Sequence, residues 1–204
     1  LLLAGWMKIA PFHFQIDPKP GESFTRYQPD YLISLLNQFQ FIVTALLVFF
    51  LARKIFDSSV AWLSLLLMLG TDLLWRFSAS GQSTMLLLLL LVLLVWALVS
   101  LDAAINDAAT GAGKIVGLSL GIGLLLGAGL LTRYAYGVVV LPVLGYLILF
   151  GGRWKYHTIA AVLVAFVAVS APWVARNLQV CGMPFGTATY APVETSLFFP
   201  QHRL

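Results

Sequence analysis

Charged residues are scarce in this 204-residue chain. Asp, Glu, Lys and Arg together make up 10% of it, whereas roughly 25% is usual in a soluble domain. Hydrophobic residues make up 60%, and the mean hydropathy is +0.93. A chain this apolar is not a soluble globular domain, and its abundance of Leu, Val and Phe excludes an intrinsically disordered one.

Cysteine and histidine are too few for several kinds of site. Cys181 is the single cysteine, which excludes a disulfide framework. The three histidines, His13, His157 and His202, are scattered, so no zinc cluster forms with that one cysteine. The net charge of +4 comes without a basic run or a nucleic-acid-binding motif, and we expect no nucleic-acid partner.

Long apolar runs dominate the rest of the sequence. A membrane-spanning helix needs about 20 mostly apolar residues. We therefore expect an all-α, polytopic transmembrane bundle of about six spans. The predicted spans are Leu32–Ala52, Ser59–Leu74, Thr84–Leu101, Ile115–Thr132, Tyr134–Phe150 and Thr158–Val174. The stretch Leu1–Phe12 is too short to span and is expected to be an interfacial, re-entrant or truncated helix.

The domain organisation follows from these runs. We expect residues 1–204 to form one membrane domain, with an external loop over 15–31, the six-span bundle over 32–174, and an external loop or tail over 175–204. The chain opens at Leu1 inside an apolar stretch, so we expect it to be a fragment of a longer protein.

The basic residues divide between the two sides of the membrane if all six segments cross it. One side collects Arg53, Lys54, Lys114, Arg153 and Lys155, and the other collects Lys19, Arg26, Arg76, Arg133, Arg176 and Arg203. The totals nearly tie, so the positive-inside rule does not decide the orientation. The first side has adjacent basic pairs in short turns, which are typical of orientation signals. We interpret it as cytoplasmic and the other side as the working face.

Arg76, Arg133 and Arg176 are the candidate substrate-binding residues, because each lies at the end of a span on the predicted working face. A guanidinium binds phosphate oxygens through planar, paired hydrogen bonds and keeps its charge when partly buried. Three of them suit a lipid phosphate or pyrophosphate, whereas snorkelling to headgroups is the simpler alternative for each one alone. Asp72 precedes Arg76 by four residues, which favours a structural ion pair on one helix face.

The catalytic residues are not evident from the sequence. Asp17, Glu22 and Asp30 are weak candidates for a general base or a divalent-metal ligand, with a solvated loop as the default interpretation.

The fourth predicted span has a stripe of small residues. Gly117, Gly121, Gly123, Gly127 and Gly129 form it. Such stripes let helices approach closely in lipid, so we interpret this one as a packing feature.

Three segments, taken in order, carry a resemblance to a known superfamily. The first runs from the turn ARKIFDSS through a span and a short loop into a leucine-rich span, and the second is LLLGAGLLTRYAYG. The third matches the pattern P-W-x-x-R-N-x-x-x-x-G-x-P-F with Pro172, Trp173, Arg176, Asn177, Gly182, Pro184 and Phe185. Together they resemble the central membrane portion of the polytopic GT-C glycosyltransferases, which include protein mannosyltransferases and aminoarabinose transferases.

The resemblance implies transfer of a sugar from a polyprenyl-phosphate carrier to an extracytoplasmic acceptor, by a multi-pass protein of the bacterial inner membrane. It also implies a catalytic carboxylate in the first external loop, which relatives place upstream of the region matching Leu1. Relatives often carry an Asp at the start of the leucine-rich span, where this sequence has Gln82, Ser83 and Thr84. This departure either counts against a metal-dependent mechanism or indicates a divergent member, so a divalent metal is left open as a cofactor and we assign no metal ligand.

The leading hypothesis is therefore a GT-C-like glycosyltransferase. Arg76, Arg133 and Arg176 would hold the carrier phosphate, and Tyr27, Tyr134 and Tyr136 would line the lipid or sugar entrance. The alternative is a non-catalytic structural subunit derived from the same fold, with other membrane subunits as partners besides the lipids. A lipid-linked-sugar flippase also fits the composition, but no motif supports it.

Overall fold

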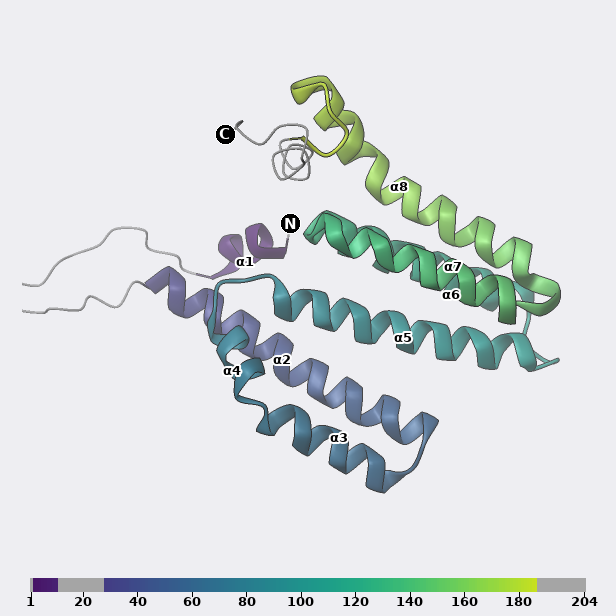
Figure 1. Ribbon diagram of the computed structural model, residues 1–204, viewed down its shortest axis with the longest axis horizontal. Helices are drawn as coiled ribbons and strands as arrows, with labels where there is room; N and C mark the ends of the chain where they lie inside the picture. The colour runs from purple at the N-terminus through teal and green to yellow at the C-terminus, as the bar shows by residue number, and fades with distance from the viewer. Residues whose placement is uncertain (1, 11–27, 187–204) are drawn as a thin grey trace, which may run out of the picture. The chain divides into compact units, whose positions relative to one another are not determined.

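The computed structural model describes residues 2–10 and 28–186, and its regular elements there are all helices (Figure 1). They are α1 (Leu2–Ile9), α2 (Gln28–Ile55), α3 (Ser58–Gly70), α4 (Asp72–Ala79), α5 (Thr84–Asn106), α6 (Ala112–Thr132), the 3-10 helix η1 (Tyr134–Val139), α7 (Val140–Phe150), the 3-10 helix η2 (Gly152–Trp154) and α8 (Lys155–Cys181). The all-α prediction is confirmed for this part of the chain.

The described helices are those of a multi-pass membrane protein. Four stretches are long and apolar enough to cross a membrane: α2, α5, α6, and η2 with α8. A fifth is the pair α3 and α4, which is bent by 58° at a short break. The remaining predicted span, Tyr134–Phe150, is a shorter apolar stretch. All six predicted segments are therefore helical, and they differ in how far each one reaches.

The reach of Tyr134–Phe150 depends on its helix type. The 6 residues of η1 rise about 2.0 Å each, and the 11 residues of α7 rise about 1.5 Å each. Together they cover roughly 28 Å, close to the hydrocarbon thickness of about 30 Å. Because a 3-10 helix rises further per residue than an α-helix, this short segment is almost as long as a membrane span.

The chain divides into two compact units within α5, unit 1 ending at Leu93 and unit 2 beginning at Leu94. In unit 1, α2 and the α3–α4 pair run antiparallel. Phe49 of α2 meets Trp62 of α3 edge to face at 5.0 Å, and Phe41, further back along α2, meets Trp75 of α4 at 5.0 Å. Asp57 begins α3 as its N-cap, accepting a 2.8 Å hydrogen bond from the backbone N–H of Val60.

The break between α3 and α4 is held by side chains that bind the carbonyls at the end of α3. The hydroxyl of Thr71 donates to the Leu67 carbonyl at 2.6 Å, and the indole Nε1 of Trp75 donates to the Leu69 carbonyl at 2.6 Å. The last carbonyls of a helix have no partner within the helix, and such groups are costly in an apolar surrounding. These bonds allow the predicted span Ser59–Leu74 to bend without leaving those carbonyls unsatisfied.

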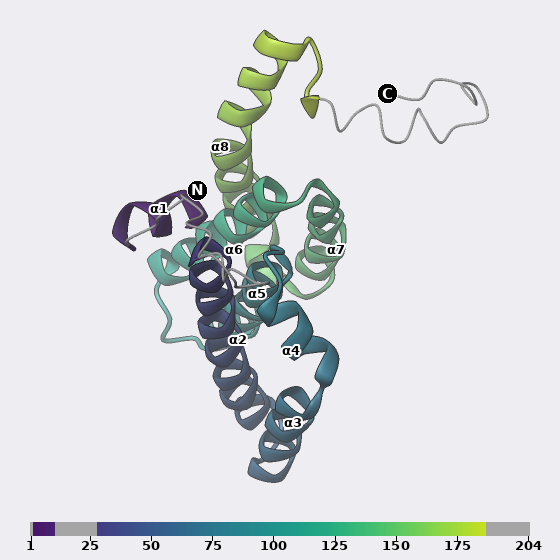
Figure 2. The same cartoon turned by 90° about the vertical axis from the view of Figure 1, so that its left-hand side faces the viewer.

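In unit 2, α6 and α8 pack in parallel through two glycines (Figure 2). A Cβ added at Gly123 would lie 2.3 Å from the Val162 carbonyl oxygen, and one at Gly127 would lie 2.7 Å from the Val169 Cβ. Ala165 also faces Gly123, so a step of four residues along α6 matches a step of four along α8. Backbone contact this close requires glycine at both positions.

The five glycines of the predicted stripe therefore have different roles. Gly123 and Gly127 make the α8 contact, and Gly129 accommodates the ring of Tyr136. A Cβ at Gly117 or Gly121 would meet nothing within 4 Å. The packing interpretation holds for three of the five glycines, and the other two face open space within the described residues.

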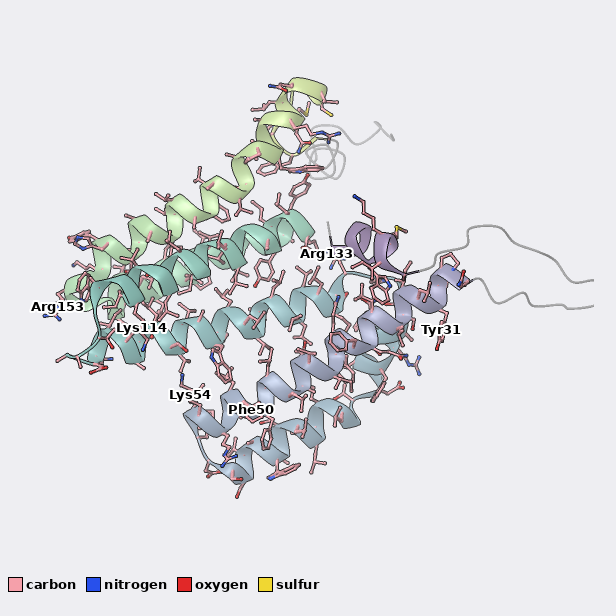
Figure 3. The ribbon with its side chains drawn as sticks, turned by 180° about the vertical axis from the view of Figure 1, so that it is seen from behind. Tyr31, Phe50, Lys54, Lys114, Arg133 and Arg153 are labelled. Carbon is pink, nitrogen blue, oxygen red and sulfur yellow. The ribbon has the colours of Figure 1, made fainter. Side chains whose placement is uncertain are left out.

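The parallel packing of α6 and α8 puts basic residues at both ends of unit 2. Lys114 and Arg153 lie at one end, and Arg133 lies at the opposite end of α6 (Figure 3). The 21 residues of α6 span roughly 30 Å at a rise of about 1.5 Å per residue. This separation is about the thickness of the hydrocarbon core, so the two basic ends suit opposite membrane surfaces.

Candidate functional site

At the Arg133 end of unit 2, three aromatic rings join η1 to α8. The Trp173 indole Nε1 donates a 2.9 Å hydrogen bond to the phenolic oxygen of Tyr134. The ring of Phe185 meets that of Tyr134 edge to face, with centroids 5.4 Å apart. Tyr134 therefore links the start of η1 to both α8 and the segment that follows it. We call the set Tyr134, Trp173 and Phe185 the aromatic clasp.

The end of α8 is shaped so that Phe185 reaches the clasp. Gly182 caps the helix in the left-handed conformation, with φ of 69°, which glycine adopts without the steric penalty of a side chain. The buried amide of Asn177 then donates a 3.2 Å hydrogen bond to the Pro184 carbonyl. The helix extends to Cys181, past the predicted limit at Val174, although Pro172 lies inside it. The spacing of the third sequence segment is thus that of a helix end that folds back on itself.

Two arginines lie at this end. The Arg176 guanidinium is 5.4 Å from the centroid of the Trp173 ring, within the range of a cation–π contact. Arg133 ends α6 in an extended conformation, and its backbone N–H donates to the Gly129 carbonyl at 2.9 Å. Both side chains are exposed, and neither has a carboxylate partner among the described residues. Two guanidinium groups without a carboxylate partner at one end of unit 2 are the candidate ligands for an anion.

Two uncharged residues of the third sequence segment, Trp173 and Asn177, each have a structural role. The indole N–H of Trp173 donates to Tyr134, and the side-chain amide of Asn177 donates to the carbonyl of Pro184. Arg176 is left as the one charged member of the segment, stacked on a ring whose position Tyr134 sets.

Arg76 belongs to unit 1, where it forms the predicted ion pair. Its Nε lies 2.6 Å from the Asp72 carboxylate, with side chains 77% and 76% exposed. An ion pair this exposed contributes at most about 1 kcal/mol. The pair is a weak constraint, and the remaining guanidinium nitrogens are accessible to a ligand.

The predicted entrance tyrosines differ in their surroundings. Tyr134 is part of the aromatic clasp. Tyr136 is buried, its ring fills the space beside Gly129, and its hydroxyl is enclosed without a hydrogen-bond partner among the described residues. Tyr27 lies outside the described residues.

Of the candidate carboxylates, Asp30 is described, whereas Asp17 and Glu22 lie outside the described residues. Asp30 is exposed in the first turn of α2, where a negative charge is favoured by the helix dipole. The described ranges contain no group of three His, Cys, Asp or Glu residues placed to hold a metal ion.

Sequence reasoning missed Asn37, which organises the turn that contains Gln82. The buried Asn37 amide of α2 donates to the carbonyls of Ser80 and Gln82. Ser83 and Thr84 follow in the same turn, and the Thr84 hydroxyl lies 3.5 Å from the Gln82 side-chain oxygen. The signal was present, since an amide inside an apolar span requires a partner.

The residues Gly117 to Gly121 read GLSLG, the spacing of a nucleophile elbow, which requires a sharp turn between a strand and a helix. Here Ser119 is buried inside α6 and donates to the Ile115 carbonyl at 2.8 Å. It is a structural serine.

Comparison with known proteins supports the sequence resemblance. A family model described as dolichyl-phosphate-mannose-protein mannosyltransferase matches residues 30–175, which is most of the chain. The match includes Arg76 and Arg133 and ends one residue before Arg176. No curated protein and no solved structure is significantly similar to the chain. The chain belongs to the dolichyl-phosphate-mannose-protein mannosyltransferase family, a family of membrane glycosyltransferases of the GT-C type.

Proposed function

We propose that this chain is the central membrane portion of a glycosyltransferase that uses a polyprenyl-phosphate sugar as donor and an extracytoplasmic acceptor. Membership of the family supports the transferase class. A lipid-linked donor is anchored in the membrane, so the protein that uses it must be embedded there too. The multi-pass helices agree with this requirement. We propose the bacterial inner membrane as its location, with membrane lipids around it.

The observation that supports the donor class is the convergence of Arg133 and Arg176 at one end of unit 2. The parallel packing of α6 on α8 produces it, together with the hydrogen bond from Trp173 to Tyr134. A guanidinium pair beside aromatic rings matches the chemistry of a lipid phosphate, which presents an anionic head on an apolar chain. Arg76 and Tyr27 are retained as further candidates for the phosphate and the entrance.

The proposed chemistry is electrostatic. The acceptor oxygen attacks the anomeric carbon of the sugar, and the bond from that carbon to the phosphate oxygen breaks. The phosphate leaves with the electron pair, and its growing charge is stabilised by Arg133 and Arg176. The acceptor's proton goes to a carboxylate on the external side, for which Asp17, Glu22 and Asp30 are the candidates in this sequence.

The experiment uses the full protein in liposomes that contain polyprenyl-phosphate mannose and acceptors extracted from the native membrane. We expect Arg133→Ala and Arg176→Ala each to reduce sugar transfer at least 100-fold, as loss of one charge-stabilising group commonly does. Arg53→Ala is the matched control, because it removes an arginine from the opposite predicted side. Normal turnover by Arg133→Ala would contradict the proposed site.

A binding measurement separates the transferase from the structural-subunit alternative. Native mass spectrometry of the wild-type protein with undecaprenyl phosphate tests the carrier site without knowledge of the sugar. Retention of the lipid by the wild type, and its loss in Arg176→Ala, would support the carrier site. No retention by the wild type would favour a structural subunit.

A further inference from the structure

A second group of basic and aromatic residues lies at the end of unit 2 opposite Arg133 (Figure 3). It occupies the turn from Gly151 to His157 that joins α7 to α8, and we call it the basic turn. Its sequence, GGRWKYH, contains two cations, each next to an aromatic residue. The proposed transferase chemistry does not use this turn.

The basic turn has a tightly specified backbone. A Cβ on Gly151 would lie 2.4 Å from the Leu147 carbonyl oxygen and 2.9 Å from the Lys155 Cα. Gly152 has φ of 51°, in the left-handed region that favours glycine. The two glycines allow α7 to end and η2 to begin without a loop, which presents the next residues in a fixed arrangement.

Each cation of the turn rests on an aromatic ring. The Arg153 guanidinium is 5.7 Å from the Trp154 ring centroid, and the Lys155 Nζ is 5.0 Å from the Tyr156 ring centroid. His157 meets Trp154 edge to face at 5.6 Å. Neither cation has a carboxylate partner among the described residues. The rings hold the cations in place without neutralising them.

The helix register adds Lys114 to this end of unit 2. Gly123 of α6 faces Val162 of α8, and Lys114 lies as far before Gly123 as Arg153 lies before Val162. The acidic groups nearby are engaged internally. Asp107 accepts hydrogen bonds from the Ala109 N–H and the Thr110 hydroxyl, and Asp102 interacts with the Tyr146 hydroxyl.

An apolar edge borders the basic turn. Leu149 and Phe150, the last residues of α7, are 76% and 60% exposed. Tyr156, in the first turn of α8, is 73% exposed. Exposed apolar side chains next to an interfacial Trp and Tyr, and then to cations, match the order of acyl chain, interface and headgroup in a bilayer.

From these observations we propose that the basic turn is a binding site for the headgroup phosphate of an anionic phospholipid, with Arg153 and Lys155 as its ligands. Trp154 and Tyr156 position the two cations at the level of the headgroups, and Lys114 flanks the site. The site lies one membrane thickness away from the proposed carrier site, so it binds a bulk membrane lipid rather than the sugar donor. The proposal stands independently of the transferase activity.

The test uses the full protein, extracted into neutral detergent and mixed with phosphatidylcholine or phosphatidylglycerol. Native mass spectrometry then counts the lipids retained. We expect selective retention of phosphatidylglycerol by the wild type. In the double variant Arg153→Gln and Lys155→Gln we expect its affinity to fall roughly 25-fold, since each basic residue near an anionic surface contributes about a factor of five.

Two further variants distinguish a specific lipid-binding site from non-specific electrostatic attraction of an anionic lipid. Tyr156→Leu keeps both charges and removes the exposed ring beneath Lys155. If the site is specific, this variant should retain less phosphatidylglycerol. The matched control, Arg53→Gln with Lys54→Gln, removes the same charge from another turn and should retain the lipid. Equal losses in both double variants, or no effect of Tyr156→Leu, would overturn the proposal. Displacement of the lipid by millimolar inorganic phosphate would also overturn it, because the ligand would then be free phosphate.

Discussion

The Trp173 indole N–H and the Tyr134 hydroxyl, which are 39 positions apart in the sequence, form a 2.9 Å hydrogen bond. This bond fixes the end of α8 against the start of η1. It also determines the ring on which Arg176 rests, since that guanidinium lies over Trp173. An arginine that the sequence places in a tail is thereby held near the end of α6.

The first prediction concerns this bond. Tyr134→Phe removes the acceptor for the Trp173 N–H and leaves both rings, so we expect a loss of about 1 kcal/mol in stability. Thermal unfolding in detergent measures it. Tyr31→Phe is the matched control, because Tyr31 is exposed and has no such hydrogen bond within residues 2–10 and 28–186. Equal effects of the two substitutions would show that the hydrogen bond does not stabilise the clasp.

The second prediction concerns the contact between α6 and α8. Gly123→Ala places a methyl group 2.3 Å from the Val162 carbonyl oxygen, so the helices must separate. We expect a loss of about 1–3 kcal/mol, the usual cost of overpacking. Gly121→Ala has nothing within 4 Å and should be neutral or slightly stabilising, because alanine favours helix. Comparable melting temperatures for the two variants would contradict the close packing.

The third prediction concerns Asn37. Asn37→Ala leaves the Ser80 and Gln82 carbonyls without this donor, and we expect a loss of about 1–3 kcal/mol. Asn106→Ala is the control, since its exposed amide donates to the Asp102 carbonyl of its own helix. Limited proteolysis between α4 and α5 gives a second measurement: cleavage should accelerate in Asn37→Ala alone. Resistance equal to that of the wild type would rule out a role for Asn37 in holding the turn.

The fourth prediction concerns pH. Hydrogen bonds from the Ala109 backbone and the Thr110 hydroxyl, aided by the charge of Lys114, hold the pKa of Asp107 below its ordinary value of 3.8. A carboxyl whose pKa is lower in the folded state stabilises the protein above the unfolded-state pKa, and that stability is lost as the pH falls through the folded-state pKa. Melting temperature should therefore decrease slightly below about pH 4 in the wild type. Asp107→Asn should lose this component, and an unchanged acid profile would refute the assignment.

Much of the architecture was predictable from the sequence. The apolar runs located all six helical segments, because each is long enough to exclude a strand. The Asp72–Arg76 pair followed from helical spacing alone, since residues four apart share a helix face. The order of three short segments also identified the family, as the match over residues 30–175 confirms.

Other features depended on contacts between distant residues. The stripe of five glycines did not reveal which of them meet α8, because that depends on how α6 is rotated. The predicted span Ser59–Leu74 gave no sign of a 58° bend, which is stabilised by side chains of Thr71 and Trp75. The helix beyond Val174 was also missed, since loss of hydropathy ends a predicted span but does not end a helix.

The sequence by itself determined the class of this protein, because burial in lipid requires long apolar helices that satisfy their own backbone. It also determined which residues carry charge. Only the tertiary structure decided which charges meet. Parallel packing through Gly123 and Gly127 puts Arg133 and Arg176 at one end of unit 2, and Lys114 with Arg153 at the other. That arrangement depends on a helix register set by side-chain volume, which hydropathy does not encode.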